Sequence, residues 1–420
     1  MDSLRGLGHA ILRKVTAAAP SLSPISPPHV PVSQRLGERQ IRDKIFVLIK
    51  HVFNSYIPTY PFIPLLKVAK SKSKSSLEPC FYGQVKMKTM DLPSTFHFQG
   101  WNIRYNLRSN NTTASNQPQL KPVVFVHGTP WSSAVFQPVI KALLAKPSYQ
   151  ILVYDLPGYG QSQEFAPSPP SSTIASSEEK PLFQGDTSVK FQAKALAGLL
   201  KHVQLDGKAE PEPEPGHPAP AVIAHDIAGT IVLRAHLLEA CEFDTMMLVD
   251  ANAVLPWGDG FYKLAREAPA SFLRLPPGIF EAVVRAVIQS AVHDTNVLKT
   301  GWEDALARPW VGGEGEAGER QKSFVRQIAQ ADDGDVAEML EGGLYGRVRC
   351  DVKIVWGEQD QWIPKHKVED LIRRLGGKVK ESAFIPEAGH LVMLDQPERF
   401  AIEVFDWLTR FGSPRSLSTS

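Results

Sequence analysis

Residues Pro220 to Ala240 read PAVIAHDIAGTIVLRAHLLEA, and this stretch decides the fold. The part up to Asp226 is an apolar run typical of a buried strand, and the part from Ala228 onward is typical of a helix. Small residues on both sides of Asp226 allow the strand and the helix to pack closely. The stretch therefore predicts a strand, a sharp turn and a helix, with the Asp226 side chain at the turn.

This arrangement has the form of a nucleophile elbow, normally G-x-S-x-G, with Asp226 in the position of the serine. The N-terminus of the following helix offers free N–H groups and the positive end of a dipole, which keep a carboxylate ionised. Such a carboxylate can attack a saturated carbon and form a covalent ester, which water then cleaves. Asp is also a common helix N-cap, so Asp226 alone does not separate a nucleophile from a cap.

Two further residues follow predicted strands in the order that this chemistry needs. His390 stands in PEAGHLVMLDQPERF, between the last strand and the last helix, and Asp360 stands in WGEQDQWIP after the preceding strand. Asp360 would hold the tautomer of the imidazole, and His390 would deprotonate the hydrolytic water. Asp250, in LVDAN, is an alternative acid. We rank it below Asp360 because of the G-x-x-D-x-W-I-P context.

The loop HGTPWSS follows another buried strand, PVVFV, and carries two further candidates, Thr129 and Trp131. The backbone N–H of Thr129, together with that of Ile227, would form an oxyanion hole for a tetrahedral intermediate. An ordinary turn at the end of a strand is the alternative interpretation. Trp131, in the same loop, is a candidate for contact with a substrate.

Strands rich in Val and Ile alternate with helices along the chain. This pattern predicts an α/β fold, with a mostly parallel eight-stranded sheet and helices on both faces. A leading hairpin, Thr95–Ser109, adds antiparallel edge strands. We expect the helix-rich residues 254–349 to be inserted before the penultimate strand, as a cap over the ends of the strands where ligands bind in such sheets.

Composition excludes several classes of function. The chain has 420 residues and a formal net charge of +2, and its Lys and Arg are matched by Asp and Glu, so no nucleic-acid partner is expected. Cys80, Cys241 and Cys350 lack the spacing of a zinc site or a redox dithiol. No His, Asp and Glu cluster has metal-ligand spacing, and the carboxylate–histidine system needs neither a metal nor a cofactor.

The N-terminal residues 1–76 are predicted to form a basic arm, because Lys and Arg outnumber Asp and Glu by nine up to Ser75. The arm has the composition of a mitochondrial transit peptide, although we favour a disordered or loosely packed arm. Ile41–Phe53 has the stripe of an amphipathic helix, which we expect to pack on the parent domain rather than on a membrane surface. We expect an intracellular, cytoplasmic protein with a disordered tail at 413–420.

The motifs HGTPWSS, DLPGYGQS, AHDIAG, WGEQDQWIP and AGHLVMLDQPE resemble, in this order, those of the α/β-hydrolase superfamily. The Asp at the elbow resembles the branch that contains epoxide hydrolases and haloalkane dehalogenases. The resemblance runs from about Thr95 to Phe411 and implies an α/β-hydrolase core of residues 77–253 and 350–412. It also implies a nucleophile, acid and base at Asp226, Asp360 and His390.

Two departures from this branch limit the choice of substrate. The residue after the nucleophile is commonly Trp, which helps to hold the halide in dehalogenases, but here it is Ile227. Epoxide hydrolases use cap tyrosines to donate hydrogen bonds to the ring oxygen, and residues 254–349 contain only Tyr262 and Tyr345. Both are candidate substrate-binding residues, like Trp131, with packing in the cap as the alternative.

Three functions therefore stay open. We favour an epoxide-hydrolase-like enzyme that acts with water on a hydrophobic small molecule. The second is a haloalkane dehalogenase or another hydrolase of the superfamily, and the third is a non-catalytic ligand-binding protein. His390 and an acid accompany Asp226, which speaks against the third. An apolar pocket is suggested by large apolar residues of the cap, namely Trp257, Phe261, Phe272, Leu275, Phe280, Trp302 and Trp310.

Overall fold

The computed structural model describes residues 89–109, 120–146, 148–167, 182–208, 217–257, 260–312 and 317–411. The predicted basic arm (1–76), its amphipathic stretch Ile41–Phe53 and the predicted tail (413–420) lie outside these ranges. The described residues all belong to one unit of the chain, Ile45–Ser420.

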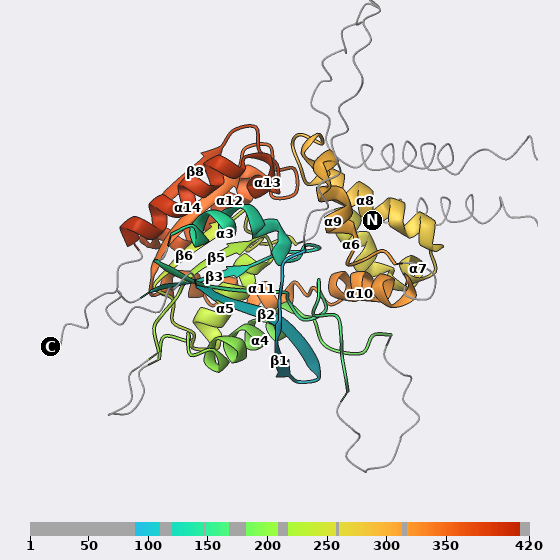
Figure 1. Ribbon diagram of the computed structural model, residues 1–420, viewed down its shortest axis with the longest axis horizontal. Helices are drawn as coiled ribbons and strands as arrows, with labels where there is room; N and C mark the ends of the chain where they lie inside the picture. Colours follow the sequence, from blue (N-terminus) through green and yellow to red (C-terminus); the bar gives the residue numbers. More distant parts are fainter. Residues whose placement is uncertain are drawn as a thin grey trace, which may run out of the picture. The chain divides into compact units, whose positions relative to one another are not determined.

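Eight strands in the described residues form one sheet in the order β1-β2-β4-β3-β5-β6-β7-β8 (Figure 1). They are β1 (Ser94–Phe98), β2 (Trp101–Ser109), β3 (Lys121–Val126), β4 (Tyr149–Tyr154), β5 (Ala221–His225), β6 (Thr245–Val249), β7 (Asp351–Gly357) and β8 (Val379–Ile385). Strands β1 and β2 form an antiparallel hairpin, and β2 pairs antiparallel with β4. All pairs from β4 to β8 are parallel, which confirms the predicted mostly parallel sheet with antiparallel edge strands.

Helices cover both faces of the sheet, as predicted (Figure 1). Helix α3 (Gln137–Leu144) contacts α14 (Pro397–Phe411) on one face, and α4 (Val189–His202) contacts α5 (Ala228–Leu238) on the other. Every residue of β5 and β6 is buried, because these central strands have helices on both sides. The remaining core elements are η2 (Ser133–Phe136), α12 (Lys365–Leu375), η5 (Gly376–Lys378) and α13 (Val392–Asp395).

A run of helices lies between β6 and β7 in the chain, where the sequence predicts an insertion. We call residues 260–347 the helical insertion. It contains α6 (Gly260–Glu267), α7 (Pro269–Leu273), α8 (Pro277–Ser290), η3 (Val297–Thr300), α9 (Trp302–Ala307), α10 (Ala317–Ala329), α11 (Gly334–Glu341) and η4 (Leu344–Arg347). Helix α10 packs against α6, α7 and α8. Several side chains of the insertion donate hydrogen bonds to the core, among them Trp310 Nε1 to the Pro130 carbonyl (2.7 Å) and Ser323 Oγ to the Gly158 carbonyl (2.8 Å).

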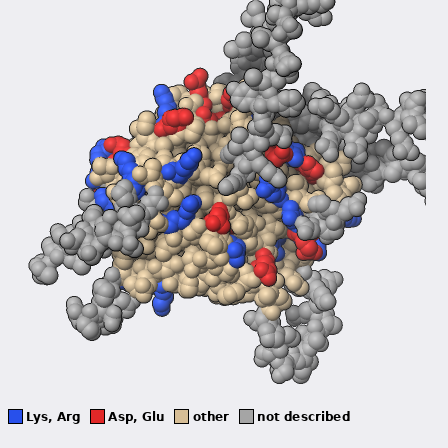
Figure 2. All heavy atoms as spheres, in the orientation of Figure 1, with Lys and Arg blue, Asp and Glu red and all other residues tan. Residues whose placement is uncertain are grey.

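The surface carries mixed charge on the face drawn in Figure 2, where Lys and Arg side chains are interspersed with Asp and Glu. Both signs are spread in this way over most globular domains. Within the described ranges, no helix combines the length and the apolar character that crossing a membrane requires.

Candidate active site

The backbone at the end of β5 forms the predicted sharp turn. Asp226 has a φ of +57°, in the left-handed region that non-glycine residues rarely adopt, and α5 begins two residues later. The Asp226 N–H donates to the Val249 carbonyl (3.0 Å), and the Asp226 carbonyl accepts from the Gly229 N–H (2.9 Å). A Cβ on Gly128 would stand 2.5 Å from the Cβ of Asp226, so this close approach requires glycine. The surrounding structure therefore holds the strained residue in place.

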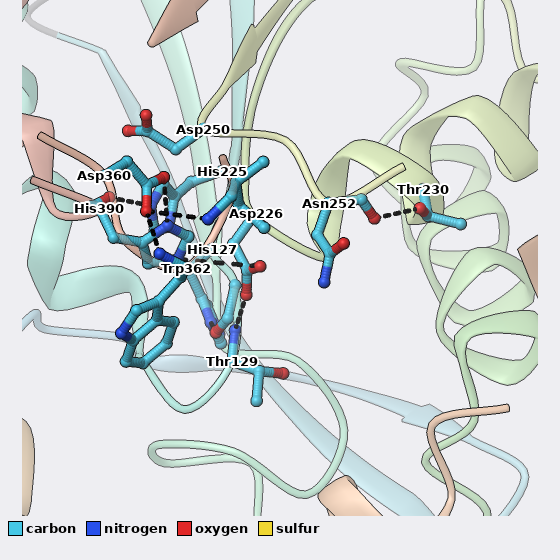
Figure 3. A network of polar contacts seen from close by, with 12 residues as sticks. His127, Thr129, His225, Asp226, Thr230, Asp250, Asn252, Asp360, Trp362 and His390 are labelled. Atoms are coloured by element: carbon cyan, nitrogen blue, oxygen red, sulfur yellow. Dashed lines mark hydrogen bonds and ion pairs between the residues drawn. The ribbon is translucent and has the colours of Figure 1, made fainter. Parts of the chain in front are cut away.

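The two carboxylate oxygens of Asp226 lie in different environments (Figure 3). Oδ2 accepts a hydrogen bond from the backbone N–H of Thr129 at 2.9 Å. Oδ1 lies 3.8 Å from Nε2 of His390. Burial raises the pKa of Asp226, while the charge on His390 and the N–H groups of Thr129 and Ile227 oppose this rise. The two N–H groups expected to form an oxyanion hole thus interact with the carboxylate of Asp226 itself.

His390 lies between two carboxylates. Its Nδ1 is 2.9 Å from Oδ2 of Asp360. The other oxygen of Asp360, Oδ1, accepts hydrogen bonds from the backbone N–H groups of Trp362 (2.7 Å) and Ile363 (3.0 Å). Because a carboxylate only accepts hydrogen bonds, Nδ1 carries the proton and Nε2 presents a lone pair toward Asp226. Burial is the largest influence on the pKa of His390 and lowers it, but Asp360 and Asp226 together raise it above its usual value.

Of the two candidate acids, Asp360 is hydrogen-bonded to the imidazole. Asp250 is fully buried, and its Oδ1 accepts the N–H of Gly357 at 2.8 Å. Its Oδ2 has no hydrogen-bond partner among the described residues.

An aromatic group surrounds His390. The Trp362 ring stacks on the imidazole with centroids 4.6 Å apart, the Trp131 ring stacks on Trp362 at 5.6 Å, and Tyr262 meets Trp362 edge-on at 5.4 Å. The Tyr262 hydroxyl and the Trp131 Nε1 are buried and have no hydrogen-bond partner among the described residues. Burial raises the pKa of Tyr262 well above its usual value, and the charge on Asp226 adds to the effect. Tyr262 therefore stands as a protonated donor near the carboxylate.

Tyr345, the other predicted tyrosine, is engaged elsewhere. Its buried hydroxyl donates to the Ala253 carbonyl at 2.5 Å. The hydroxyl proton is therefore engaged within the protein, and this contact favours the alternative of packing within the cap over a substrate contact for Tyr345.

Two residues near the site escaped the sequence analysis. Trp362 follows Asp360 by two positions inside the motif WGEQDQWIP. This short distance along the chain from the candidate acid could have indicated that Trp362 lies near the site. Tyr159 lies in DLPGYGQS, and its hydroxyl is 2.7 Å from Oγ1 of Thr129. The charge on Asp226 contributes to the raised pKa of Tyr159, after burial as the main cause. No sequence signal links Tyr159 to Thr129, which is 30 residues away.

The candidate nucleophile and base are covered: Asp226 is 5% exposed and His390 is 1% exposed. A separate cavity of about 300 Å³ is lined by Ser132, Ser133, Arg308 and Arg320, but neither Asp226 nor His390 lines it. Within the described residues, no group of three or more His, Cys, Asp or Glu side chains is arranged to hold a metal ion.

Comparisons with known proteins identify the family. A family model described as alpha/beta hydrolase family matches residues 123–404. An alpha/beta hydrolase fold protein from Burkholderia ambifaria is 29% identical, with a TM-score of 0.60, over 76% of this chain and 99% of that chain. A search of proteins with curated descriptions gives no match.

Two further solved structures share the fold at lower identity. A thermophilic esterase from Thermogutta terrifontis is 18% identical over 78% of this chain and 99% of its own, with a TM-score of 0.53. The epoxide hydrolase CorEH is 15% identical over 75% of this chain and 98% of its own, with a TM-score of 0.54. Since the family model matches well over half of the sequence, the chain belongs to the α/β-hydrolase family.

Proposed function

We propose that this protein is a hydrolase that forms a covalent ester on Asp226 and opens epoxides carried by hydrophobic small molecules. The observation that carries the proposal is that the two carboxylate oxygens of Asp226 have different contacts. Oδ2 is held by the Thr129 N–H, whereas Oδ1 lies 3.8 Å from Nε2 of His390 and faces its lone pair. One oxygen is therefore anchored while the other is available to attack.

In the first step, Oδ1 attacks a ring carbon of the epoxide. The new carbon–oxygen bond forms as the ring C–O bond breaks, and the electron pair of the broken bond goes to the ring oxygen. Tyr262 is the donor we assign to this oxygen, because its buried hydroxyl has no other partner among the described residues and lies near Asp226. Proton donation to the developing alkoxide is general acid catalysis.

In the second step, water hydrolyses the ester. His390 Nε2 removes a proton from the water, the resulting hydroxide attacks Cγ of Asp226, and Asp360 stabilises the imidazolium through Nδ1. Negative charge then develops on Oδ2, which already accepts the Thr129 N–H. Collapse of the intermediate breaks the bond between Cγ and Oδ1. The leaving alkoxide takes the proton of the new hydroxyl on Cγ and departs as the diol, which restores the Asp226 carboxylate, and His390 returns its proton to the Tyr262 phenolate.

The helical insertion would act as a cap that selects hydrophobic substrates. Tyr262 contacts the ring of Phe261 and the ring of Trp362, so aromatic surface adjoins the donor hydroxyl. Buried aromatic surface favours apolar substrates.

A second candidate reaction is dehalogenation of a haloalkane, in which the same attack expels a halide. The observation in its favour is the buried Trp131 N–H, which has no partner among the described residues. Against it stands Ile227, because dehalogenases of the branch that the sequence resembles commonly have Trp at that position.

The decisive experiment is a single turnover in ¹⁸O-labelled water, with styrene oxide and 1-bromohexane as probes and enzyme in excess. We expect one labelled oxygen in the peptide that contains Asp226, because water attacks Cγ and leaves its oxygen on the carboxylate. The His390→Ala variant should accumulate the alkylated peptide, and the Asp226→Asn variant should show neither mass change. An unlabelled peptide after product release would contradict the ester, and absence of turnover with both probe classes despite binding would favour a ligand-binding protein.

A further inference from the structure

Two loops that follow neighbouring parallel strands meet beside the nucleophile. Thr129 lies in the loop after β3, and Tyr159 lies in the loop after β4, which pairs with β3. The hydroxyl groups of the two residues lie 2.7 Å apart, at hydrogen-bond distance. The Thr129 N–H donates to Oδ2 of Asp226 at 2.9 Å, as Figure 3 shows. Two hydrogen bonds in series therefore connect the Tyr159 hydroxyl to the nucleophile.

The position of Tyr159 is fixed by contacts other than the one with Thr129. Tyr159 is 2% exposed, and its ring meets the rings of His127 and Trp310 edge-on, with centroids 5.5 Å and 5.8 Å away. Two backbone hydrogen bonds close the turn around it, from the Tyr159 N–H to the Leu156 carbonyl (2.8 Å) and from the Ser162 N–H to the Tyr159 carbonyl (2.7 Å). Because close packing confines a buried ring to one rotamer, the hydroxyl has a defined place.

The Thr129 side chain depends on that hydroxyl. Within the part of the chain that the structure describes, Tyr159 is the residue to which the Thr129 hydroxyl is hydrogen-bonded. The next residue has a separate contact, since the Pro130 carbonyl accepts the Trp310 indole N–H (2.7 Å). The side chain and the backbone N–H of a residue are attached to the same Cα. Anchoring Oγ1 therefore restricts the rotation of Thr129 and sets the direction of its N–H.

The direction of this N–H matters in one of the two steps proposed above. When water attacks the ester, negative charge develops on Oδ2 of Asp226, and a donor already aimed at this oxygen stabilises it. When the ester forms, the carboxylate loses its charge, so the hydrogen bond from Thr129 becomes weaker. A misdirected Thr129 N–H should therefore slow the hydrolysis of the ester and leave its formation nearly unchanged.

We propose that Tyr159 is a positioning residue of this site, whose hydroxyl holds Thr129 so that the Thr129 N–H stays aimed at Oδ2 of Asp226. Tyr159 acts through Thr129, whereas Tyr262 is the tyrosine that we assign to the substrate. The effect on ester hydrolysis rests on the proposed function, but the effect on the direction of the N–H does not. The two effects are therefore measured separately.

The first measurement is NMR of the full-length protein without substrate, with ¹⁵N-labelled threonine. The Thr129 amide signal is identified by its loss in Thr129→Ser. We expect its proton to move upfield in Tyr159→Phe, because the hydrogen bond to the carboxylate becomes longer or less direct. Tyr154→Phe is the matched control, since the Tyr154 hydroxyl is buried and has no hydrogen-bond partner among the described residues. It should leave the Thr129 signal in place.

The second measurement is a single turnover of styrene oxide, in which the formation and the hydrolysis of the ester are timed separately. Hydrolysis should slow by about tenfold in Tyr159→Phe, which is the order of one hydrogen bond. Formation should stay within about twofold of the wild type. Thr129→Val removes the other hydroxyl and should give the same loss, with no further loss in the double variant. Thr129→Ser keeps a hydroxyl and should hydrolyse the ester at nearly the rate of the wild type.

Two results would overturn the proposal. One is an unchanged Thr129 amide signal in Tyr159→Phe, and the other is a pair of losses that add in the double variant. If styrene oxide is not turned over, the proposed function is at fault, and the amide signal still decides the role of Tyr159. If thermal unfolding shows that Tyr159→Phe does not fold, the comparison of Thr129→Val with Thr129→Ser decides it, since equal rates of hydrolysis would contradict the proposal.

Discussion

The catalytic centre and the helical insertion are held in place by different kinds of contact. Asp226 is fixed by backbone groups: its N–H and carbonyl are hydrogen-bonded at the strand-to-helix turn, and its carboxylate accepts the Thr129 N–H. The insertion reaches the core largely through side chains, such as the indole of Trp310 and the hydroxyl of Ser323, which donate to core carbonyl groups. A backbone hydrogen bond from the Leu391 N–H to the Ala291 carbonyl adds to these contacts. Backbone contacts do not depend on side-chain identity, whereas side-chain contacts do.

This difference separates the reaction from the choice of substrate. The geometry of nucleophile and base follows from strand ends and turns that many sequences can form. The side chains that face a substrate from the insertion can change without disturbing that geometry. We therefore expect substitutions at the centre to abolish turnover and substitutions in the insertion, apart from Tyr262, to change the substrate preference or the stability.

The largest effect is expected from Gly128→Ala, which tests the rigidity of the centre. The new Cβ would stand 2.5 Å from the Cβ of Asp226 and 2.7 Å from its Oδ2, so either the nucleophile or the Thr129 N–H must move. Turnover should fall by about 10³-fold, the upper range for loss of an oxyanion-hole donor. Gly278→Ala, in α8 of the insertion with no atom within 4 Å of the new Cβ, is the matched control and should keep its rate. Equal turnover rates in the two variants would contradict the expectation that the centre is more sensitive to substitution than the insertion.

Tyr262→Phe tests the part of the insertion that lies nearest to the nucleophile. The phenyl ring keeps the edge contact with Trp362 but lacks the hydroxyl that we assign to the leaving oxygen. We expect ring opening to slow by about 10²-fold, measured as the rate of ester formation in a single turnover. Hydrolysis of the ester should change less, because His390 and Oδ2 of Asp226 are untouched. An unchanged rate of ester formation would mean that Tyr262 only packs.

The pH dependence of turnover reports on the centre alone. His390 must be neutral to accept a proton, and Asp360 and Asp226 raise its pKa against the effect of burial. The charge on Asp226 disappears when the ester forms, so in the step where His390 acts only Asp360 opposes the effect of burial on its pKa. The acid limb of kcat should therefore lie below the pH at which His390 titrates in the free protein. Below this limb kcat should fall by about tenfold per pH unit. Substitutions in the insertion other than Tyr262 should leave the limb in place, and an acid limb above the titration of His390 in the free protein would contradict the assigned base.

The smallest effect is expected from Tyr345→Phe, the counterpart of Tyr262→Phe. The variant loses the hydrogen bond to the Ala253 carbonyl, which is buried, so the free energy of unfolding should drop by about 1–3 kcal/mol. Denaturant unfolding measures this loss. The rate of ester formation should stay within about twofold of the wild type, because most effects of such a substitution fall on stability. A large loss of rate with unchanged stability would place Tyr345 back among the substrate contacts.

Much of the fold could be predicted because its signals are local. The apolar run that ends at Asp226 and the small residues around the turn predict β5, the elbow and α5 without reference to any other part of the chain. The order of strands and helices then gives the parallel sheet, and the ends of neighbouring strands meet at one edge. This reasoning was enough to select Asp226, Asp360 and His390, which the structure brings together.

The side chains around these three could not be assigned in the same way, because their directions depend on contacts between distant elements. Tyr345 looked equivalent to Tyr262, yet its hydroxyl bonds to a carbonyl 92 residues earlier in the chain. Trp362 was part of a recognised motif, but its stacking on His390 depends on how two loops approach each other. Tyr159 lies near the nucleophile through Thr129, which only the folded chain reveals.

The hydrogen bond from the Thr129 N–H to Asp226 has a consequence for chemical selectivity. In a serine enzyme with this elbow, the same N–H group would bind the carbonyl oxygen of an acyl substrate. Here an oxygen of the Asp226 side chain occupies that position. In the mechanism that we propose, this oxygen would exclude the carbonyl of a carboxylic ester or an amide, and a tetrahedral carbon would be the electrophile that reacts.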